Sequence, residues 1–339
     1  MTTTHPAPAP TEAGVVSPEP IMRVASGFMA AKLLFAASEL GLFEALGESP
    51  ATLDALAART GLTRRAARIS ADAMVALGLL ERDGDRYRNG PAAARYLAGR
   101  TPADLRPFLT FWDKISYPNW EALTEALGSG PPREVFDLDD TQQQIVSAGI
   151  EAILTGPAHA LAEAAHLSGR RRLLDVGGGT GSWSIAAVRR HPDLEATVFE
   201  LPVTAEIARR RVREVGVADR VAVVEGDAFT DALPEGHDAF LLANLVHYWA
   251  PEANVTLLQR VRAAASAGGR LLLADFWTDP THTQPVQAAL MAGEFAVHVR
   301  EGDVYSVEEV QDWLPEAGWR FVEHAPLAGP QSVIVAEAE

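Results

Sequence analysis

The feature that most constrains the fold is an alternation of short apolar runs with helical patterns beyond Arg170. Each run has the length of a β-strand, and the stretches between the runs have the apolar spacing of amphipathic helices. The runs read RRLLDVG, EATVFEL, RVAVVEG, HDAFLLAN, GRLLLADF, WRFVEHAPL and QSVIVAEA. Strands that alternate with helices form parallel sheets with helices on both faces. We therefore predict an α/β fold with a doubly wound sheet of seven strands and an antiparallel pair at its C-terminal edge.

The first half of the chain predicts a helical module that ends in a small hairpin. Helical patterns extend from Met22 to about Leu46 and through TLDALAARTGLT and RRAARISADAMVALGLL, and the Asp-Gly and Asn-Gly signals of ERDGDRYRNGPAAARYL indicate a hairpin. This order is that of a winged helix. A Pro- and Ala-rich start without apolar period is typical of a disordered tail. We expect a tail at 1–20, a mostly helical winged-helix domain at 21–100, a helical linker at 101–169 and the sheet domain at 170–339.

Composition excludes several classes of function. The chain has 339 residues and no cysteine, so disulfides and thiolate metal sites are excluded. A formal net charge of −16 argues against nucleic acid and anionic membranes as partners. No apolar run approaches the roughly 20 residues that span a bilayer, and the N-terminus lacks the pattern of a signal peptide. We therefore expect a cytoplasmic protein with no nucleic-acid or membrane partner.

Arginines in the helical module raise a competing hypothesis. They lie in or near the helix that a winged-helix transcription factor would place in DNA: Arg59, Arg64, Arg65 and Arg68. The alternative is that the module packs against another subunit or covers a substrate site, with its arginines solvated or paired with acids. The acidity of the whole chain favours this alternative.

The most specific motif is LLDVGGGTGSWSIA, an apolar strand that ends in Asp175 and a glycine-rich turn that opens a helix. Residues without a Cβ, such as Gly177 and Gly179, let backbone amides approach a ligand at the carboxyl end of a strand. Glu200 ends the next strand, where a carboxylate can accept hydrogen bonds from a ribose diol. Asp227 and Phe229 follow the third strand, where they can contact an adenine. The motif lacks the Gly-x-Gly-x-x-Gly spacing of a dinucleotide site and the Lys of a P-loop. A nucleoside without phosphates is therefore a better fit to this turn than a dinucleotide or a nucleoside triphosphate.

These residues resemble a known family, the class I S-adenosylmethionine (SAM)-dependent methyltransferases with their Rossmann-like domain. DVGGGTG, VFELP, GDAF, LVHYWAPE and AGGRLLLADF occur in the family's order and approximate spacing. Together with the winged-helix start, the resemblance covers the chain from about residue 20 and is to the two-domain small-molecule O-methyltransferases. It implies SAM as cofactor and a homodimer formed through the N-terminal domain. Carried over by motif, the cofactor residues are Gly177, Gly179, Glu200, Asp227 and Ala228. One departure is Ala243, where many plant members have a Lys that contacts the cofactor.

His247 in LVHYWAPE follows a predicted strand, at the edge where the cofactor's methyl group should lie. It corresponds to the histidine that acts as general base in the phenolic O-methyltransferases of the family. An imidazole suits this role because its ordinary pKa is close to neutrality. Asp275 ends the next strand, where it can orient the imidazole ring. The other histidines, at positions 159, 166, 191, 237 and 282, lack such a context, and we expect them at the surface or in loops.

Glu294 and His298 lie four residues apart in MAGEFAVHVREGD, a spacing that puts both on one face of a helix. In the family this helix runs along the substrate pocket, so both would point toward His247. Two histidines and a carboxylate are the ligands of a facial triad. Our leading hypothesis is that His247, Glu294 and His298 bind zinc, iron, manganese, cobalt or nickel, as in the actinobacterial 2-oxo acid C-methyltransferases. The metal would stabilise an enolate whose β-carbon takes the methyl group.

Two alternatives remain open beside this hypothesis. The first is metal-independent O-methylation of a phenolic or polyketide hydroxyl, with His247 as base and Asp275 or Glu294 in support. The second, more remote, is a winged-helix regulator that retains a ligand-binding methyltransferase fold. Both enzyme hypotheses imply a small-molecule substrate in secondary metabolism.

Further substrate-pocket candidates come from the linker segment FLTFWDKISYPNW, because linker helices cover the substrate site in the family. They are Trp112, Lys114 and Tyr117, with Lys114 able to pair with a substrate carboxylate. Met291, one turn before Glu294, can pack against substrate or cofactor. The structural alternative is that Trp112 and Met291 belong to the core and that Lys114 is solvated.

Overall fold

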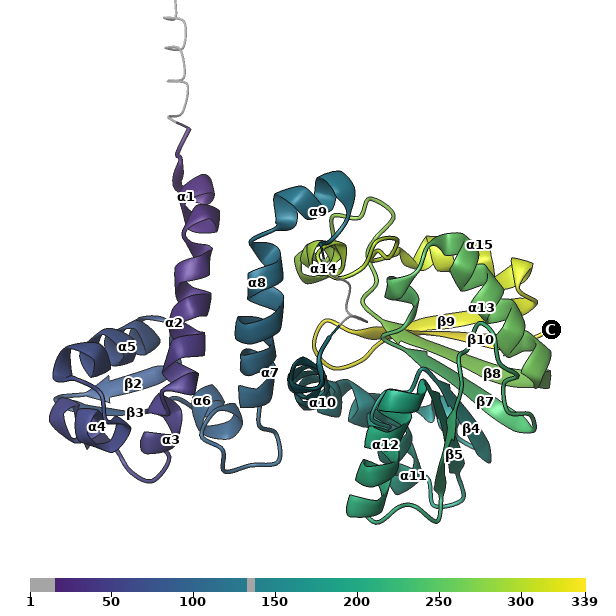
Figure 1. Cartoon of the computed structure of the whole chain (residues 1–339), viewed down its shortest axis with the longest axis horizontal. Helices are drawn as coiled ribbons and strands as arrows, with labels where there is room; N and C mark the ends of the chain where they lie inside the picture. The colour runs from purple at the N-terminus through teal and green to yellow at the C-terminus, as the bar shows by residue number, and fades with distance from the viewer. Residues whose placement is uncertain (1–15, 133–137) are drawn as a thin grey trace, which may run out of the picture. The chain divides into compact units, whose positions relative to one another are not determined.

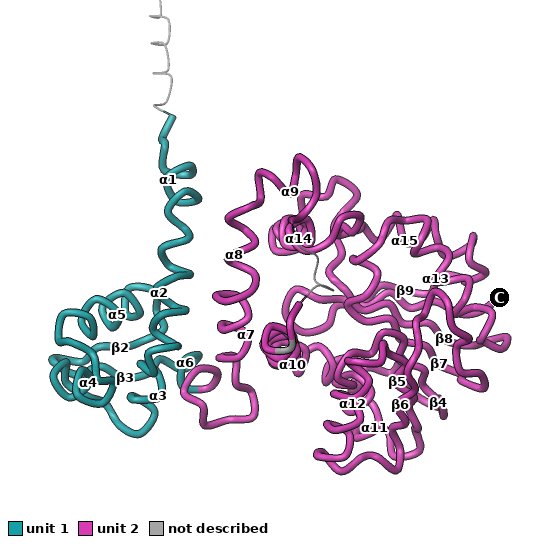
Figure 2. Tube along the Cα trace, viewed as in Figure 1, with its two compact units in different colours: residues 1–94 teal, residues 95–339 magenta. Residues whose placement is uncertain are grey.

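The computed structural model describes residues 16–132 and 138–339. The chain forms two compact units, residues 1–94 and 95–339 (Figure 2). Most of the predicted tail, 1–20, lies outside the described residues, and the first helix already begins at Glu19. The remaining predicted domain limits stay predictions.

The first unit consists of helices and one small sheet. Thr52 and Thr63 cap the two central helices by accepting backbone N–H bonds, and Gly61 ends the first of them with a φ of 68°. The three strands pair antiparallel in the order β1-β3-β2. The elements are α1 (Glu19–Ala25), α2 (Gly27–Glu39), α3 (Leu42–Ala45), β1 (Ala51–Thr52), α4 (Leu53–Thr60), α5 (Arg64–Ala76), β2 (Leu80–Asp83), β3 (Arg86–Asn89) and α6 (Pro91–Tyr96), the last of which reaches into the second unit.

The second unit begins with helices and continues as an α/β sheet (Figure 1). The helical part contains α7 (Arg106–Phe111), the π-helical turn η1 (Trp112–Ser116), α8 (Tyr117–Trp120), α9 (Leu123–Ser129), α10 (Asp140–Glu163) and η3 (Ala165–Leu167). The sheet part contains β4 (Arg172–Val176), α11 (Ser182–Arg190), β5 (Glu195–Glu200), α12 (Pro202–Glu214), β6 (Val221–Glu225), β7 (His237–Ala243), η4 (Val246–Tyr248), α13 (Pro251–Ala264), β8 (Ala265–Asp275), α14 (Val286–Ala296), α15 (Val307–Glu316), β9 (Trp319–Pro326) and β10 (Ser332–Ala338).

The sheet has the predicted topology. Its seven strands follow the order β6-β5-β4-β7-β8-β10-β9, and the first five are parallel. β10 lies between β8 and β9 and is antiparallel to both. All seven apolar runs of the sequence are strands, so the predicted fold class is confirmed. The strand order reverses between β4 and β7, which places the carboxyl end of β4 at the point where open α/β sheets bind ligands.

Helices cover both faces of this sheet (Figure 1). On one face, α10, α11 and α12 pack their apolar side chains against the strands, with Leu154, Trp183 and Val212 buried between them. On the other face, α13 and α15 do the same with Leu257 and Leu314. The central strands β4, β7 and β10 are buried along most of their length, which is why they read as nearly continuous apolar runs in the sequence, whereas the outer strands β6 and β9 are partly exposed.

Two helical stretches are long and apolar enough to cross a membrane, contrary to the expectation from the sequence. They are Glu19–Glu39 and Thr141–Glu163. This is weak support for a membrane span, because the core helix of a soluble protein passes the same test. The second stretch lies within α10, where Leu154, Ala158 and Leu161 are buried against the sheet domain.

Asn254 of α13 holds the turn that follows β7. The side chain is fully buried, and its Nδ2 donates to the carbonyls of Val246, at 2.9 Å, and Trp249, at 3.0 Å. The substitution Asn254→Ala removes this donor from the buried Val246 carbonyl and from the partly buried Trp249 carbonyl, so we expect the free energy of unfolding to fall by about 1–3 kcal/mol in urea denaturation.

Thr256→Ala in the same helix is the matched control, because the Thr256 hydroxyl bonds only to Glu252 O on the surface. We expect the control to stay within about 0.5 kcal/mol of the wild type. Equal stability of the Asn254→Ala protein and the control would contradict the assignment.

Candidate active site

The glycine-rich turn between β4 and α11 cannot carry larger side chains. Gly177, Gly179 and Gly181 have φ values of 65°, 56° and 81°, in the left-handed region that favours glycine. A Cβ at Gly177 would lie 2.6 Å from the Leu245 side chain, and one at Gly178 would lie 2.7 Å from the Asp175 carboxyl carbon. The turn is therefore a bare backbone surface at the carboxyl end of the sheet.

Asp175, a predicted cofactor residue, lies beneath this turn. Its carboxyl group is fully buried and accepts a hydrogen bond from Ser184 Oγ at 2.7 Å. Its Oδ1 is buried with no hydrogen-bond partner among the described residues. Burial raises the pKa of Asp175 to about 7; the Ser184 bond opposes this shift and the nearby Glu200 adds to it. Asp175 therefore supports the turn from below.

Glu200 joins the ends of β4 and β5. Its Oε2 accepts from the backbone N–H of Gly179 at 2.8 Å, and its Oε1 accepts from that of Leu201 at 2.7 Å. Burial raises the pKa of Glu200, although both backbone bonds act against this shift. The predicted ribose-binding carboxylate thus lies beside the glycine-rich turn.

The loop after β6 carries the other predicted cofactor residues. Asp227 Oδ1 accepts from Phe229 N at 2.8 Å, and Ala228 O accepts from Arg260 Nε at 2.6 Å. The Phe229 ring packs edge-on against Trp249, with 4.9 Å between ring centroids. These contacts fix the loop at the same edge of the sheet as the glycine-rich turn.

His247 and Asp275 meet at the ends of β7 and β8. Both side chains are buried, and His247 Nδ1 lies 2.8 Å from Asp275 Oδ1 and 3.0 Å from Oδ2. Asp275 Oδ1 also accepts from Phe276 N at 2.8 Å. Because a carboxylate only accepts, Nδ1 is the protonated nitrogen of a neutral His247, and Nε2 retains its lone pair.

Two aromatic rings enclose the His247 imidazole. Phe295 of α14 stacks on it with 3.9 Å between centroids and 11° between planes. The Tyr248 ring lies at 4.4 Å with a tilt of 57°. Burial raises the pKa of Tyr248 to about 12, and nearby carboxylates add to this shift. The sequence analysis did not single out either ring, although Phe295 lies between Glu294 and His298 in the sequence.

The Glu294 carboxylate is the centre of a buried hydrogen-bond network. Oε2 accepts from Ser116 Oγ at 2.7 Å and from Trp120 Nε1 at 2.5 Å, and Oε1 lies 2.8 Å from His298 Nε2. His298 Nδ1 lies 3.2 Å from Asn119 Nδ2. The linker residues of this network lie in η1 and α8, within the stretch FLTFWDKISYPNW, from which the sequence analysis named Trp112, Lys114 and Tyr117 but not Ser116, Asn119 or Trp120. π-Helical turns such as η1 are frequent at functional sites.

The predicted metal site is not formed. Glu294 binds Ser116, Trp120 and His298 with its two oxygens, and His247 Nδ1 faces Asp275. Across residues 16–132 and 138–339, no three His, Cys, Asp or Glu side chains come together in a way that would hold a metal ion. The Glu-x-x-x-His spacing brings Glu294 and His298 into a hydrogen bond with each other. His247, Glu294 and His298 therefore do not fit a facial triad.

The remaining substrate candidates differ in their surroundings. Trp112 packs edge-on against Phe108 and Phe111. Tyr117 and Met291 are half-buried, and Met291 packs with a small apolar cluster that includes Phe295. Lys114 is exposed and pairs with Asp113 at 3.1 Å, which matches the solvated alternative.

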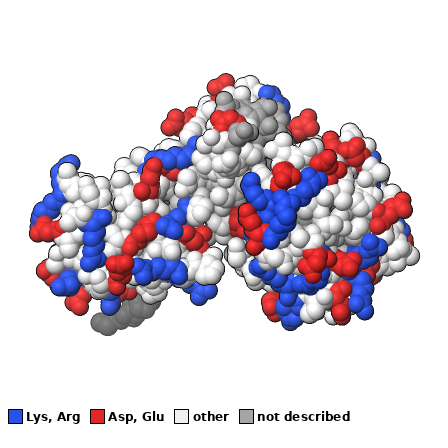
Figure 3. All heavy atoms as spheres, turned by 60° about the horizontal axis from the view of Figure 1, so that its bottom comes forward, with Lys and Arg blue, Asp and Glu red and all other residues white. Residues whose placement is uncertain are grey.

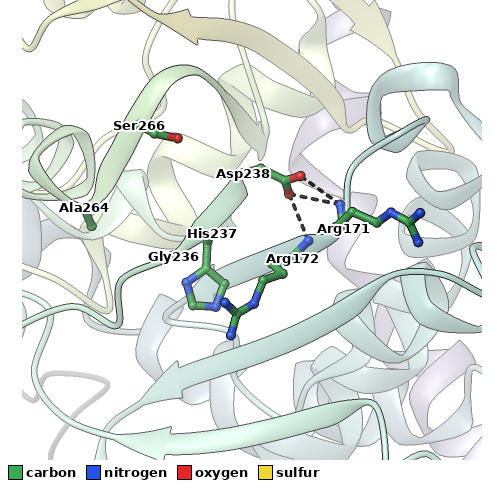
Figure 4. A pocket seen from close by; sticks show the side chains of 7 residues that line it. All are labelled: Arg171, Arg172, Gly236, His237, Asp238, Ala264 and Ser266. Atoms are coloured by element: carbon green, nitrogen blue, oxygen red, sulfur yellow. Dashed lines mark hydrogen bonds between the residues drawn. The ribbon is translucent and has the colours of Figure 1, made fainter.

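A cavity of about 210 Å³ lies elsewhere, at the amino ends of β4, β7 and β8 (Figure 4). Arg172, His237, Asp238 and Ser266 line it. His237 is buried, contrary to the surface position that we expected, and bonds to Pro234 O and Thr197 Oγ1 at 3.1 Å each. This cavity is at the opposite end of the strands from the glycine-rich turn and contains none of the predicted site residues.

Comparison with known proteins identifies the family. Residues 120–320 match the O-methyltransferase domain, and residues 22–99 match the O-methyltransferase dimerisation domain. The chain therefore belongs to the two-domain O-methyltransferase family and is a SAM-dependent methyltransferase of small molecules in secondary metabolism.

Individual relatives align over nearly the whole chain. The 3-hydroxy-5-methyl-1-naphthoate 3-O-methyltransferase of Streptomyces sahachiroi is 35% identical, over 91% of each chain. The tetracenomycin polyketide synthesis 8-O-methyl transferase of Streptomyces glaucescens is 32% identical, over 95% of this chain and 97% of that one. The crystal structure of human N-acetylserotonin methyltransferase in complex with SAM shares the fold, with a TM-score of 0.83 at 24% identity, over 97% and 99% of the two chains.

These comparisons do not support two of the hypotheses drawn from the sequence. The relatives named above are O-methyltransferases, so the 2-oxo acid C-methyltransferase branch is not supported. The helical module matches a dimerisation domain, and three of its arginines are engaged within the chain: Arg59 with Ser49, Arg64 with Asp54 and Arg68 with Asp72. Acidic and basic side chains are mixed over the face shown in Figure 3. Neither observation favours the DNA-binding regulator.

The site's own residues fit SAM as cofactor. The bare glycine-rich turn gives backbone amides close access to a ligand, Glu200 offers carboxylate oxygens beside it, and buried Asp175 adds a second acid beneath the turn. Such a donor and acceptor set suits a ligand with a sugar diol and a positive charge.

Asp175 should make stability depend on pH. A carboxyl whose pKa is higher in the folded protein than in the unfolded chain holds its proton more tightly when folded. The free energy of unfolding should therefore fall as pH rises from about 4 to about 7. Asp175→Asn removes this titration, so its stability relative to wild type should rise between pH 5 and pH 8 by at least about 1.4 kcal/mol, the equivalent of one pH unit.

Chemical denaturation at a series of pH values measures this difference. Asp193→Asn, which removes an exposed carboxylate near Arg171, is the control and should follow the wild type. A difference between Asp175→Asn and wild type that stays constant from pH 5 to pH 8 would overturn the assignment.

Proposed function

We propose that this methyltransferase transfers a methyl group to a hydroxyl of a phenolic or polyketide substrate, with His247 as general base and without a metal. The observation that carries the proposal is the buried pair of His247 and Asp275, with 2.8 Å between Nδ1 and Oδ1. This contact holds the imidazole in the tautomer whose Nε2 can accept a proton. The relatives named above act on oxygen, which supports the same assignment.

The chemistry follows from the two nitrogens of His247. SAM supplies an electrophilic methyl group on a sulfonium sulfur. His247 Nε2 takes the hydroxyl proton while the hydroxyl oxygen bonds to the methyl carbon and the carbon–sulfur bond breaks toward sulfur. Asp275 balances the positive charge that the imidazole gains, because its carboxylate stays bonded to Nδ1. Most of the acceleration comes from aligning oxygen, carbon and sulfur.

The aromatic surroundings favour a planar acceptor. Trp120 donates to the buried Glu294, and Trp112 packs against Phe108 and Phe111 in the same linker. Aromatic side chains pack well against other rings by stacked or edge-on contacts. We therefore assign the linker from η1 to α8 as the cover of the acceptor site, with Trp112, Tyr117 and Met291 as contact candidates.

We also propose a homodimer formed through the N-terminal unit. The match to a dimerisation domain supports it, as do the exposed apolar side chains of α1 and α2, including Ile21 at 72% and Val24 at 79% exposure. Large exposed apolar patches mark interaction surfaces. Light scattering on the purified full chain, which should give twice the mass of one chain, measures the state directly.

Replacing the proposed base should abolish chemistry and spare cofactor binding. We expect His247→Ala to lower kcat by about 10²–10⁴-fold, because general-base catalysis contributes roughly that factor. The KM for SAM should change little. The assay uses a hydroxynaphthoate or polyketide phenol accepted by the wild type, and His159→Ala, an exposed histidine of α10, is the control.

The same assay tests independence from metals. Full activity in excess chelator is expected. Loss of activity on chelation and its return with a divalent metal would contradict the proposal, as would a fully active His247→Ala variant.

Phe295 should act by orienting the base. Phe295→Leu keeps an apolar side chain but removes the ring that stacks on His247, so the imidazole gains rotational freedom. We expect kcat to fall by roughly tenfold with little change in the KM for SAM, since a misplaced base weakens only the transition state. Phe295→Tyr keeps the ring and should restore most of kcat. Equal kcat values for the Leu and Tyr variants would contradict an orienting role.

A further inference from the structure

Glu151, a residue of α10 that the sequence analysis did not single out, binds the glycine-rich turn. One of its carboxylate oxygens, Oε2, accepts from Thr180 Oγ1 at 2.9 Å and from Ser182 Oγ at 3.0 Å. The same oxygen forms an ion pair with Arg211 of α12, and both side chains are only 25% exposed. A single carboxylate thus joins three elements around the turn: α10, the start of α11, and α12.

The network encloses charges away from bulk water. Burial lowers the pKa of Arg211 to about 10, and Arg211 Nη1 also lies 3.4 Å from Thr180 Oγ1. Removing one member of a partly buried ion pair leaves the other charge uncompensated. Glu151 therefore contacts each of the other three polar groups, and Thr180 in turn lies within hydrogen-bond distance of Ser182 and Arg211.

The same helix contacts the linker two residues earlier. A Cβ at Gly149 would overlap the Cβ of Phe111 and lie 3.2 Å from Pro107 O, so α10 and α7 are in close backbone contact there. Phe111 directly precedes η1, whose Ser116 donates to Glu294. Between Gly149 and Glu151, α10 therefore connects the linker to the cofactor turn.

We propose that Glu151 is a positioning residue for the cofactor, and that α10 transmits the placement of the linker to the glycine-rich turn. Glu151 holds the Thr180 and Ser182 hydroxyls so that the turn keeps the shape that receives SAM. The role of Glu151 requires only the established SAM dependence of the chain. The proposed effect of the linker on the glycine-rich turn, through α10, rests on the proposed function, because it assumes that the linker covers the acceptor site.

The test of Glu151 measures cofactor binding without any acceptor. S-Adenosylhomocysteine is titrated into the full-length protein by calorimetry. We expect Glu151→Gln to raise its Kd roughly tenfold, because hydrogen bonds to a charged group exceed those to a neutral one by about that factor. In turnover assays the KM for SAM should rise similarly with kcat nearly unchanged, since the turn holds the cofactor equally in ground and transition states.

Glu163→Gln is the matched control, with the same substitution in the same helix at an exposed ion pair with Arg190. Its Kd should equal that of the wild type. A Glu151→Gln protein that binds S-adenosylhomocysteine like the wild type would overturn the proposal. So would a loss of kcat without any change in KM or Kd, which would indicate a general structural role.

A double-mutant cycle guards against a folding defect in one variant. Ser182→Ala removes one hydroxyl bond and leaves the ion pair between Glu151 and Arg211 intact. The increase in Kd of the combined Glu151→Gln and Ser182→Ala protein should be smaller than the product of the two single increases, because both substitutions act on the same hydrogen bond. Additive effects would show that Glu151 does not act through Ser182.

The link through α10 has its own test. Gly149→Ala should force α10 away from Phe111 and raise the Kd of S-adenosylhomocysteine several-fold, although Gly149 is not among the residues that bind the turn. Gly156→Ala in the same helix is the control, because a Cβ there meets Ala328 at an ordinary 3.5 Å. Equal Kd values for the two alanine variants would overturn the link and leave both the role of Glu151 and the proposed O-methylation untouched.

Discussion

The parallel pairing of β7 with β8 is the constraint on which the active site depends. Its register sets Ala243 opposite Ala274, and Asn244 N continues the ladder by donating to Ala274 O at 2.8 Å. Asp275 is the next residue of β8, and the turn after β7 returns His247 to it. Asn254 fixes that turn by binding its carbonyls. A shift of one residue would turn the Asp275 side chain to the other face of the sheet and separate the pair.

The sequence predicts the strand ends and the glycine-rich turn better than it predicts the contacts of the linker. Strand ends and glycines are local signals, so β4, Asp175 and the turn could be placed without knowing the rest of the fold. The partners of Glu294 could not, because Ser116 and Trp120 are 178 and 174 residues away in the chain. Helical spacing showed that Glu294 and His298 share a face, but the same spacing fits a metal site and a hydrogen-bonded pair equally well.

The two buried histidines near the carboxyl ends of the strands, His247 and His298, differ in what their partners leave available. His298 uses Nε2 for Glu294 and Nδ1 for Asn119, so both nitrogens are engaged. His247 uses Nδ1 for Asp275 and keeps Nε2 for another proton. Glu294 already has three partners, and a carboxylate so engaged is better suited to hold the linker than to exchange protons with a substrate. This difference in hydrogen bonding separates the proposed base from a structural pair of similar composition.

The two halves of the proposed site also differ in the elements that form them. The proposed cofactor half consists of the backbone of the glycine-rich turn and of carboxylates near strand ends. The proposed acceptor half consists of side chains from the linker, η4 and α14, which lie outside the strands. Because α10 contacts both halves, through Gly149 and Glu151, it is where a change in acceptor cover would reach the cofactor turn.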